Sequence, residues 1–429
     1  MLTDRYGLEL STASVEARDA YVAAVDCLLA AGAGGEPAFA AVTALDPAFA
    51  LPHLGRARCL ALYGRGEEAR AAAARGRELA APASRRERQH VAALALAIEG
   101  RAADALAATL AHLEEFPRDA MVLAPATGVF GLYGFSGRPE REHELLALMD
   151  RLAPHYGEDW WFLGQHAFAE CERGRLAGAE ARVERALALN PKSGHVAHVR
   201  AHVYYELGQD AAAARFLAGW LQNYPREGQM HCHVSWHAAM CALMLDDPAG
   251  ALAIYEASIR PGGSAGPPLN VLTDAAALLW RLELAGHPQP RAAWTGIREF
   301  ALERFPKAGV TFADVHNAMV FAVSGDSASA GRLADALRTG IGRQWAADVA
   351  EPVARGMAAF ARADWSAAIE AIAPVAAALA SIGGSRAQRD LVEYTLLAAY
   401  LRAARGDEAK ALIARRTGRR PTVAVAGWA

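Results

Sequence analysis

The chain has 429 residues, of which 53% are hydrophobic, 8% aromatic and 21% charged, a composition typical of an ordered soluble protein. Its formal net charge is −3 and its pI is about 6.5, so it lacks the basic excess that binding to nucleic acid requires. The five cysteines form no CxxC pair, and neither a secretory signal nor an 18-residue apolar run free of charge is visible. We therefore expect a cytoplasmic protein with reduced thiols that contacts neither nucleic acid nor membrane.

Prolines recur at nearly constant intervals in the first half of the chain. Intervals of 35, 35, 37, 37 and 34 residues separate Pro47, Pro82, Pro117, Pro154, Pro191 and Pro225. They approach the 34-residue tetratricopeptide unit, in which two antiparallel helices end in a proline turn. Small residues such as Ala179 and Ala186 stand where the two helices must approach closely. The sequence predicts an all-α fold, a tetratricopeptide-like α-solenoid of antiparallel helix pairs curled around a concave pocket.

Apolar periodicity and turn residues predict helices along the whole chain and no sheet. In chain order we expect helices over 15–31, 37–45, 51–63, 66–80, 86–99, 102–115, 119–133, 139–152, 159–172, 176–189, 193–207, 210–223, 230–245, 248–258, 269–286, 291–304, 312–323, 327–340, 349–363, 366–381, 386–405 and 407–415. The breaker-rich stretch 261–268 is predicted to be a loop. It separates N-terminal repeats over 1–260 from C-terminal repeats over 269–415, which continue the same solenoid. Residues 416–429 form the tail, which we expect to be loose after Gly418.

Six of the 14 histidines lie between Pro191 and Cys241. His198 and His202 are four residues apart, as are His233 and His237, so each pair shares one face of a helix. The two pairs are 35 residues apart, which places them at equivalent positions of neighbouring helices packed about 8–10 Å apart. Three readings stay open for the four imidazoles: a bound divalent metal ion, a structural hydrogen-bonded network, or ligand binding and acid–base chemistry.

Carboxylates that could join the histidines are Glu170, Glu172, Asp274 and Asp314, but no HExxH motif is present. Asp314 and His316 stand at the start of a predicted helix, where an aspartate could orient a histidine base, or could simply cap the helix. Ser385 is predicted to cap the next helix, with Arg386 and Arg389 in its first turn, where cations oppose the helix dipole. Arg389 therefore needs a carboxylate partner, either in a ligand or in the protein, with Asp390 and Asp274 as candidates.

Motifs in family order over nearly the whole chain resemble the tetratricopeptide-repeat protein 38 family. The matching stretches are residues 7–14, the segment from Ala186 to Pro191, His198-x3-His202, Cys232-His-x2-Trp-His237, the segment from Ala253 to Tyr255, Asp274 with Trp280-Arg-Leu282, Asp314-x-His316, and Gly383-Gly-Ser-Arg-Ala-Gln-Arg-Asp390. The resemblance implies an α-helical repeat fold in a soluble protein and supplies no settled reaction. Family members carry a further histidine two residues after the equivalent of His202, where this chain has Tyr204.

The predicted function is binding of a small polar ligand or a peptide in a histidine-lined concave pocket. The ligand-binding residues would be His198, His202, Tyr204, Trp236, Asp274 and Arg389. The alternative is a hydrolase or lyase with a histidine general base, in which Arg389 holds an anionic substrate and the catalytic residues would be His233, His237, Asp314 and His316. A third reading is a protein-interaction scaffold. No cofactor is assigned; a divalent metal at His198, His202, His233 and His237 and a homo-oligomer both stay open.

Overall fold

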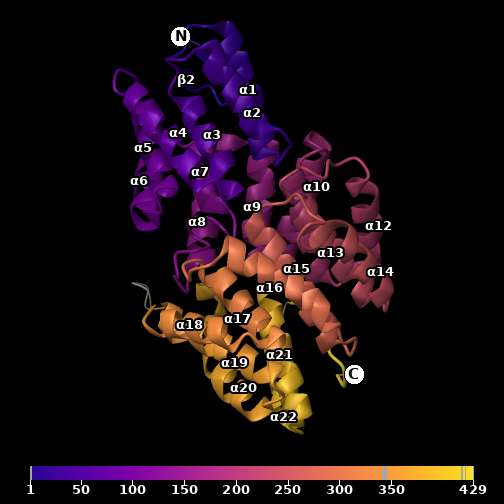
Figure 1. Cartoon of the computed structure of the whole chain (residues 1–429). Helices are drawn as coiled ribbons and strands as arrows, with labels where there is room; N and C mark the ends of the chain where they lie inside the picture. The colour runs from indigo at the N-terminus through magenta and orange to yellow at the C-terminus, as the bar shows by residue number, and fades with distance from the viewer. Residues whose placement is uncertain (1, 341–344, 417–418, 421, 429) are drawn as a thin grey trace.

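Helices make up nearly all the regular structure in the computed structural model, which describes residues 2–340, 345–416, 419–420 and 422–428 (Figure 1). These residues contain 22 α-helices in antiparallel pairs, which confirms the predicted all-α, tetratricopeptide-like fold. The first eleven are α1 (Val15–Leu29), α2 (Gly35–Leu45), α3 (Leu51–Leu62), α4 (Gly66–Leu79), α5 (Arg85–Ile98), α6 (Ala102–Glu115), α7 (Ala120–Thr127), α8 (Arg141–Tyr156), α9 (Trp160–Glu172), α10 (Leu176–Leu189) and α11 (Gly194–Leu207).

The second half of the chain continues the same pattern. Its helices are α12 (Asp210–Leu221), α13 (His231–Met244), α14 (Pro248–Ile254), α15 (Pro268–Leu284), α16 (Arg291–Arg304), α17 (Thr311–Ser324), α18 (Ser327–Arg338), α19 (Glu351–Ala361), α20 (Trp365–Ile372), α21 (Arg386–Arg402) and α22 (Gly406–Ala414). Three further helical segments extend or precede these: the π-helical η1 (Tyr255–Ile259) and η3 (Ala346–Ala350), and the 3-10 segment η4 (Ala373–Ile382). The predicted loop joins η1 to α15.

The proline spacing marks the ends of second helices, as the repeat requires. Pro47, Pro82, Pro117, Pro191 and Pro225 each follow the helix that closes a pair, because a proline cannot continue the helical hydrogen-bond ladder. Pro154 differs, since it lies inside the last turn of α8. The small residues Ala179 and Ala186 are fully buried on α10, which packs against α9.

Two local features differ from the expectation. The predicted helix over 119–133 ends at Thr127, because Gly128, Gly131 and Gly134 form tight turns after it; a Cβ on Gly134 would lie 2.0 Å from the carbonyl oxygen of Val129. A two-residue antiparallel hairpin, β1 (Leu2–Thr3) and β2 (Glu9–Leu10), precedes α1. Strands this short leave no periodicity that a sequence pattern could reveal.

The C-terminal helices pack back onto the first half of the chain. Arg141, at the start of α8, donates hydrogen bonds to the carbonyl oxygens of Ala380 (2.7 Å) and Gly384 (2.6 Å). The Tyr205 hydroxyl on α11 donates to Asp390 on α21 at 2.6 Å. Later segments of the chain therefore pack against α8 and α11.

The described part of the C-terminal tail is tied down, contrary to the loose tail we expected. The Arg416 guanidinium binds Asp390, and Arg419 forms ion pairs with Asp390 and Glu393. Arg420 is 2% exposed and pairs with Asp210 on α12. Buried carboxylates on α21 and α12 need cationic partners, and the tail supplies them.

Among the residues that the structure describes, one helical stretch, Trp365–Ile382, is long and apolar enough to cross a membrane by length and composition alone. This is weak evidence, because the core helix of a soluble protein has the same character. Here Ile369, Ile372 and Leu379 of the stretch belong to the largest buried hydrophobic cluster.

Candidate functional site

The histidine pairs lie on α11 and α13, each of which is the first helix of its repeat. His198 and His202 belong to α11, and His233 and His237 belong to α13. Ser193 begins α11 by accepting a hydrogen bond from the amide of Val196, and Gly208 ends it in the left-handed conformation (φ 69°), which favours glycine. Pro225 follows α12, and the turn over residues 226–230 leads into α13. Because α11 packs against α13 and α13 against α15, the same helical face of each meets its neighbour.

The side chains of His198, His202, His233 and His237 form one cluster, called the four-histidine cluster below. One nitrogen atom of each imidazole lies within 4.8 Å of the corresponding atoms of the other three. The Nε2 atoms of His198 and His202 are 2.8 Å apart, so one of them carries the shared proton. Ring centroids of His198 and His233 are 4.8 Å apart, and those of His202 and His237 are 4.6 Å apart. The spacing of 35 residues therefore correctly predicted that the pairs converge.

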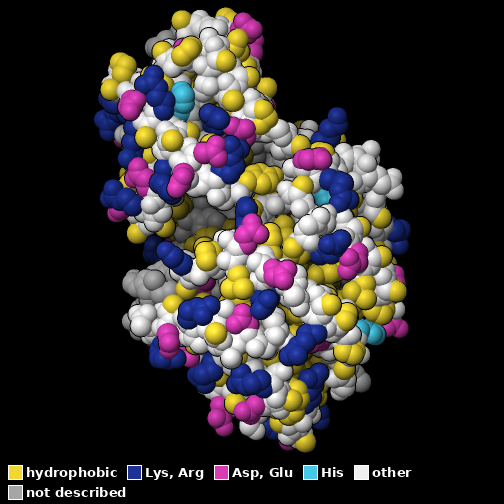
Figure 2. All heavy atoms as spheres, viewed as in Figure 1, with side chains coloured by type: hydrophobic (Ala, Val, Ile, Leu, Met, Phe, Trp, Pro, Cys, Tyr) yellow, Lys and Arg dark blue, Asp and Glu magenta, His cyan; other side chains and the backbone are white. Residues whose placement is uncertain are grey.

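The cluster is closed off from solvent. The exposed fraction of its side chains ranges from 0% for His202 to 7% for His198. Few histidines appear on the molecular face in Figure 2, where acidic and basic side chains are interspersed. The histidines therefore lie in the interior rather than along an open groove. A substrate would have no direct path to them.

Burial favours the neutral form of three of these imidazoles. Loss of hydration lowers the pKa of His198, His202 and His237 well below the usual value, and the neighbouring histidines lower it further. A neutral imidazole has one nitrogen free to accept a hydrogen bond or to bind a metal. Nδ1 of His202 and Nε2 of His237 have no hydrogen-bond partner. Unpartnered buried nitrogens are costly, so the cluster is chemically incomplete as it stands.

Asp274 on α15, in the next repeat, contacts one histidine of the cluster. Both of its carboxylate oxygens lie 2.9 Å from Nδ1 of His233, so Nδ1 donates and Nε2 is the free nitrogen of this ring. Burial raises the pKa of Asp274, and the contact with His233 works against that rise. The Trp236 ring is fully buried and stacks on the His233 ring, with centroids 5.2 Å apart and an angle of 10°.

Cys232 lies beside Asp274, with its Sγ 4.0 Å from the carboxylate. The residue is fully buried, and burial raises the pKa of its thiol well above the usual value. A thiol held in this state is a poor nucleophile. Cys232 is therefore part of the packing behind the cluster.

Phe168 completes the inner face, although sequence reasoning did not single it out. Its ring centroid lies 5.0 Å from that of His202 and 5.5 Å from that of His198. The repeat spacing could have identified Phe168, because it stands one repeat before His202. Equivalent positions on four consecutive first helices are Phe168, His202, His237 and Asp274, separated by 34, 35 and 37 residues.

Tyr204 lies apart from the cluster, unlike the pocket position we expected for it. Its ring packs under the Arg200 guanidinium at 4.0 Å and near Phe216 of α12. Two residues along a helix correspond to a rotation of about 200°, so Tyr204 and His202 face opposite sides of α11. Trp236 is the one of the two predicted aromatic residues that contacts the histidines.

Asp314 and His316 do not form the expected pair. Nδ1 of His316 lies 2.8 Å from the carbonyl oxygen of Phe312, to which it donates. Asp314 accepts a hydrogen bond from the amide of Gly309 at 3.1 Å, which ties down the turn before α17. Burial lowers the pKa of His316 to about 4. On a helix, side chains two residues apart diverge, and both groups bind backbone instead.

Arg389 also lies away from the histidines, and its carboxylate partner is neither Asp390 nor Asp274. It pairs with Glu142 on α8 and donates to the carbonyl oxygen of Gly384, while Glu172 on α9 lies 3.9 Å away. Ser385 and Gln388 form a capping box at the start of α21, which confirms the predicted cap. The partner came from a helix 247 residues earlier, a pairing that only the folded chain creates.

A second buried histidine group was not recognised in the sequence. Asp119 accepts hydrogen bonds from Arg86 (3.0 and 2.9 Å), and one of its oxygens also lies 3.0 Å from His90 and 3.1 Å from His112. We call these four residues the Asp119 network. Arg86 and His90 are four residues apart on α5, which was the available signal. Burial acts to raise the pKa of Asp119, but Arg86 and both histidines hold it well below the usual value.

A match to a family model supports the repeat architecture. Residues 172–231 match the family model described as a tetratricopeptide repeat, a range that includes α10, α11 and α12. Among solved structures, a monomeric mutant of IFIT1 with Gppp-AAAA has 14% identity and a TM-score of 0.43, covering 97% of this chain and 95% of that one. The human IFIT1 dimer with PPP-AAAA has 15% identity and a TM-score of 0.42, covering 96% and 92%.

The tetratricopeptide domain of P58(IPK) has 14% identity and a TM-score of 0.22, covering 92% of this chain and 100% of that one. TM-scores below 0.5 carry no inference about this protein. The repeat match and the helix pairs together make this chain a tetratricopeptide-repeat helical protein with a buried cluster of four histidines.

Proposed function

We propose that this helical-repeat protein binds one divalent transition-metal ion at the four-histidine cluster. The observation that carries the proposal is the convergence of four buried imidazole nitrogens within 4.8 Å of one another. Around a tetrahedral ion with bonds of about 2.0–2.1 Å, ligand nitrogens lie roughly 3.3 Å apart. The four nitrogens would therefore have to move closer together than their present spacing of up to 4.8 Å when an ion binds.

The donor set fits zinc and the neighbouring metals. Imidazole suits zinc, copper, nickel and iron, whereas magnesium and calcium prefer oxygen ligands. The low pKa of His198, His202 and His237 supports binding, because a metal need not displace a proton from these rings near pH 7. A metal would also occupy nitrogens that now have no partner.

Asp274 supports the same function. A histidine that binds a metal usually donates its other ring nitrogen to a carboxylate, which orients the ring and raises its basicity. Asp274 stands in that relation to His233. Its negative charge would offset part of the charge of a divalent ion in a buried site.

Metal binding is better supported than the open ligand pocket or the hydrolase or lyase. His233 and His237 are 3% and 2% exposed, so neither can meet a substrate without rearrangement. Four protein ligands fill a tetrahedral zinc site, which is the arrangement of structural rather than catalytic zinc. The ion would join α11 to α13 and stabilise the contact between two repeats.

We further propose that the chain belongs to the tetratricopeptide-repeat protein 38 family and acts in the cytoplasm. The family proposal is supported by the Cys232-His-x2-Trp-His237 and Gly383–Asp390 motifs. Both motifs have a structural role in this chain. The first supplies two of the four clustered histidines, and the second forms the capping box of α21 and the ion pair between Arg389 and Glu142.

Metal content and thermal stability test the proposal. The full chain, loaded with zinc and dialysed, should carry one ion per molecule by mass spectrometry, and its melting temperature should rise by mass action. Cobalt should bind with the visible absorption of a tetrahedral nitrogen site. His202→Ala and His233→Ala should lose the ion, and the control His155→Ala, an exposed residue on α8, should keep it.

A wild-type chain that takes up none of zinc, cobalt, nickel or copper would contradict the proposal. The cluster would then be a hydrogen-bonded histidine network that serves packing alone. Uptake that survives both cluster substitutions would place the metal elsewhere in the molecule.

A further inference from the structure

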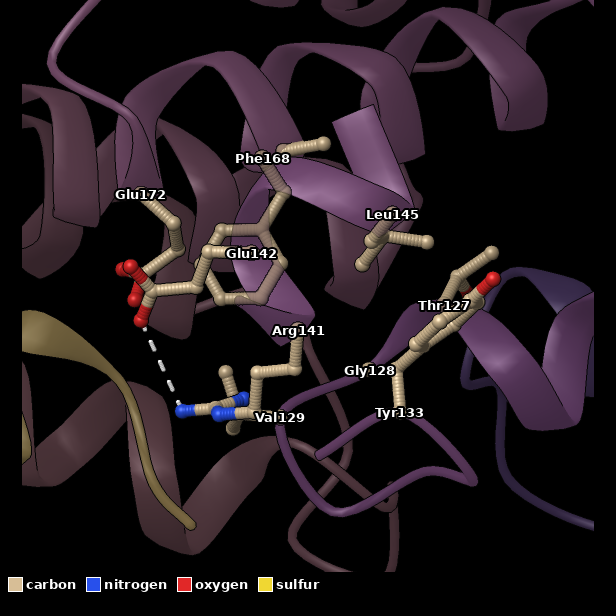
Figure 3. Close-up of a pocket in the computed structure, with 10 residues that line it drawn as sticks. Thr127, Gly128, Val129, Tyr133, Arg141, Glu142, Leu145, Phe168 and Glu172 are labelled. Atoms are coloured by element: carbon tan, nitrogen blue, oxygen red, sulfur yellow. Dashed lines mark ion pairs between the residues drawn. The ribbon is translucent and has the colours of Figure 1, made fainter. Parts of the chain in front are cut away.

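Two acidic side chains lie together where α8, α9 and the start of α21 meet. Figure 3 shows the carboxylates of Glu142, on α8, and Glu172, on α9, side by side. The same nitrogen of Arg389, Nη2, lies 2.5 Å from an oxygen of Glu142 and 3.9 Å from an oxygen of Glu172. We call the two acidic side chains the glutamate pair.

The two members of the glutamate pair differ in their partners. Glu142 pairs with Arg389 and lies 3.6 Å from the Arg141 guanidinium. In Glu172, oxygen Oε2 accepts a hydrogen bond from the backbone amide of Arg386 at 2.8 Å. The other oxygen, Oε1, has no hydrogen-bond partner among the described residues, although the residue is only 6% exposed. Buried polar atoms are generally hydrogen-bonded, so a hydrogen atom is expected at Oε1.

The surroundings of the glutamate pair do not supply that hydrogen atom. Arg141 and Arg389 both donate to the carbonyl oxygen of Gly384, and Arg386 donates to that of Cys171. The hollow beside the pair has room for about one water molecule, and the unpartnered Oε1 is buried. The remaining source is a proton on the carboxyl group itself.

The charges around Glu172 favour its protonated form. Burial raises the pKa of Glu172 to about 7. Glu142 on α8 and Glu206 on α11 add to the rise, and Arg389 and Arg386 on α21 oppose it. Burial also acts to raise the pKa of Glu142, but the neighbouring arginines hold it below the usual value. Neighbouring carboxyl groups whose pKa values are moved apart hold one proton between them over the intervening pH range.

The glutamate pair also fastens the start of α21 to the first half of the chain. Glu172 accepts the amide of Arg386, and Glu142 pairs with Arg389, so each carboxylate holds one residue in the first turn of α21. A change in the charge of the pair therefore acts directly on this attachment.

We propose that Glu172 and Glu142 share one proton, and that this proton makes the attachment of α21 to α8 and α9 sensitive to pH. The Glu172 carboxyl carries the proton on Oε1 and donates it to the Glu142 carboxylate, while Oε2 still accepts the amide of Arg386. Without the proton, two adjacent carboxylates are both ionised and repel each other. The proposal does not depend on metal binding.

The shared proton belongs to the folded chain. A glutamate in the unfolded chain has a pKa of about 4.3, whereas that of folded Glu172 is about 7, so between these values the folded chain binds the extra proton. The stability that the proton contributes therefore falls as the pH rises and is lost as the pH passes about 7. From pH 6 to pH 8 the loss corresponds to about a tenfold decrease in the equilibrium constant for folding.

Infrared spectroscopy and chemical denaturation of the full chain, kept free of metal by a chelator, test the proposal. The wild-type chain should show the C=O band of a protonated carboxyl at pH 6, and this band should be lost by pH 8. Glu172→Gln should lack the band at both pH values. Its folding constant should also fall about tenfold less than that of the wild-type chain between them. Glu78→Gln, at an exposed residue paired with Arg75, is the control and should behave as the wild-type chain does.

Glu142→Gln distinguishes a shared proton from burial alone. The substitution removes the neighbouring negative charge, so the C=O band of Glu172 should disappear at a pH at least one unit lower. Loss of the band at an unchanged pH would overturn the sharing. If Glu172→Gln does not fold by circular dichroism, the wild-type chain decides: a C=O region that is the same at pH 6 and pH 8 would overturn the proposal.

Discussion

The four-histidine cluster and the Asp119 network are both buried and both use histidines, yet they differ in how their polar atoms are satisfied. In the Asp119 network a carboxylate lies at the centre, and Arg86, His90 and His112 all bind it. In the four-histidine cluster the centre is occupied by the imidazoles themselves, and Asp274 lies behind one of them.

Under the proposed function, the Asp119 network is a structural site and the four-histidine cluster is a metal site. The chain itself supplies both charges of the Asp119 network, Arg86 and Asp119, and Nε2 of His90 is its unpartnered ring nitrogen. The four-histidine cluster brings acceptor nitrogens together and leaves Nδ1 of His202 and Nε2 of His237 without partners. Polar groups that a protein buries without satisfying them are costly, and here two of them lie among four converging imidazoles.

The largest effect is expected from breaking the Asp119 network. Asp119→Asn removes the negative charge and leaves the Arg86 guanidinium, which is 5% exposed, without its partner. Breaking a buried pair in this way costs about 3–5 kcal/mol. Chemical denaturation should therefore show a loss of that size in the free energy of unfolding. Zinc uptake by the folded variant should equal that of the wild-type chain.

Asp104→Asn is the matched control, because Asp104 pairs with Arg101 on the surface. Exposed pairs contribute about 0–1 kcal/mol. A similar loss in both variants would mean that burial of the Asp119 network has no energetic consequence.

Acid should destabilise the metal-free protein through the four-histidine cluster. Burial lowers the pKa of His198, His202 and His237 in the folded protein. Below about pH 6.5 these histidines therefore bind protons in the unfolded chain but remain neutral in the folded one. Stability therefore falls as pH falls. Between pH 6.5 and 5.5 each of the three histidines lowers the free energy of unfolding by about 1 kcal/mol, or about 3 kcal/mol together.

Denaturation curves of the wild-type chain and of His202→Asn across this pH range measure the share of one histidine. Over the same pH unit, the free energy of unfolding of the variant should fall by about 1 kcal/mol less than that of the wild-type chain. Identical slopes would show that His202 titrates freely in the folded protein.

The architecture could be predicted from the sequence because it rests on local, periodic signals. Proline spacing gave the repeat, and two i,i+4 histidine pairs at a distance of 35 residues gave the four-histidine cluster. Each of these signals lies within one repeat or between adjacent repeats, where helix geometry dictates which faces meet.

The rest depended on contacts between distant parts of the chain. Arg389 meets Glu142 across 247 residues, and Arg141 meets the carbonyl of Gly384 across 243. No spacing rule predicts such pairs, since they arise where the C-terminal helices fold back. Tyr204 was misplaced for a different reason: a helical rotation of about 200° separates it from His202, so the two side chains lie on opposite sides of α11.

Asp274→Asn should weaken zinc binding about 10–100-fold, the usual cost of losing a carboxylate behind a metal-binding histidine. The asparagine keeps the size of the side chain but cannot hold the charge opposite His233. Competition with a chelator of known affinity measures the change. Asp364→Asn is the control, because Asp364 caps α20 through the amide of Ala367; a loss of affinity in that variant would point to a general effect on folding.

Tyr204→Phe should have the smallest effect, and it tests whether α11 presents one functional face or two. The substitution keeps the ring that packs on Arg200 and Phe216, so the free energy of unfolding should change by less than about 0.5 kcal/mol. Zinc affinity should not change, because the Tyr204 ring lies on the side of α11 opposite His202. A loss of zinc binding comparable to that of Asp274→Asn would contradict this orientation, since it would require the Tyr204 hydroxyl to reach the four-histidine cluster.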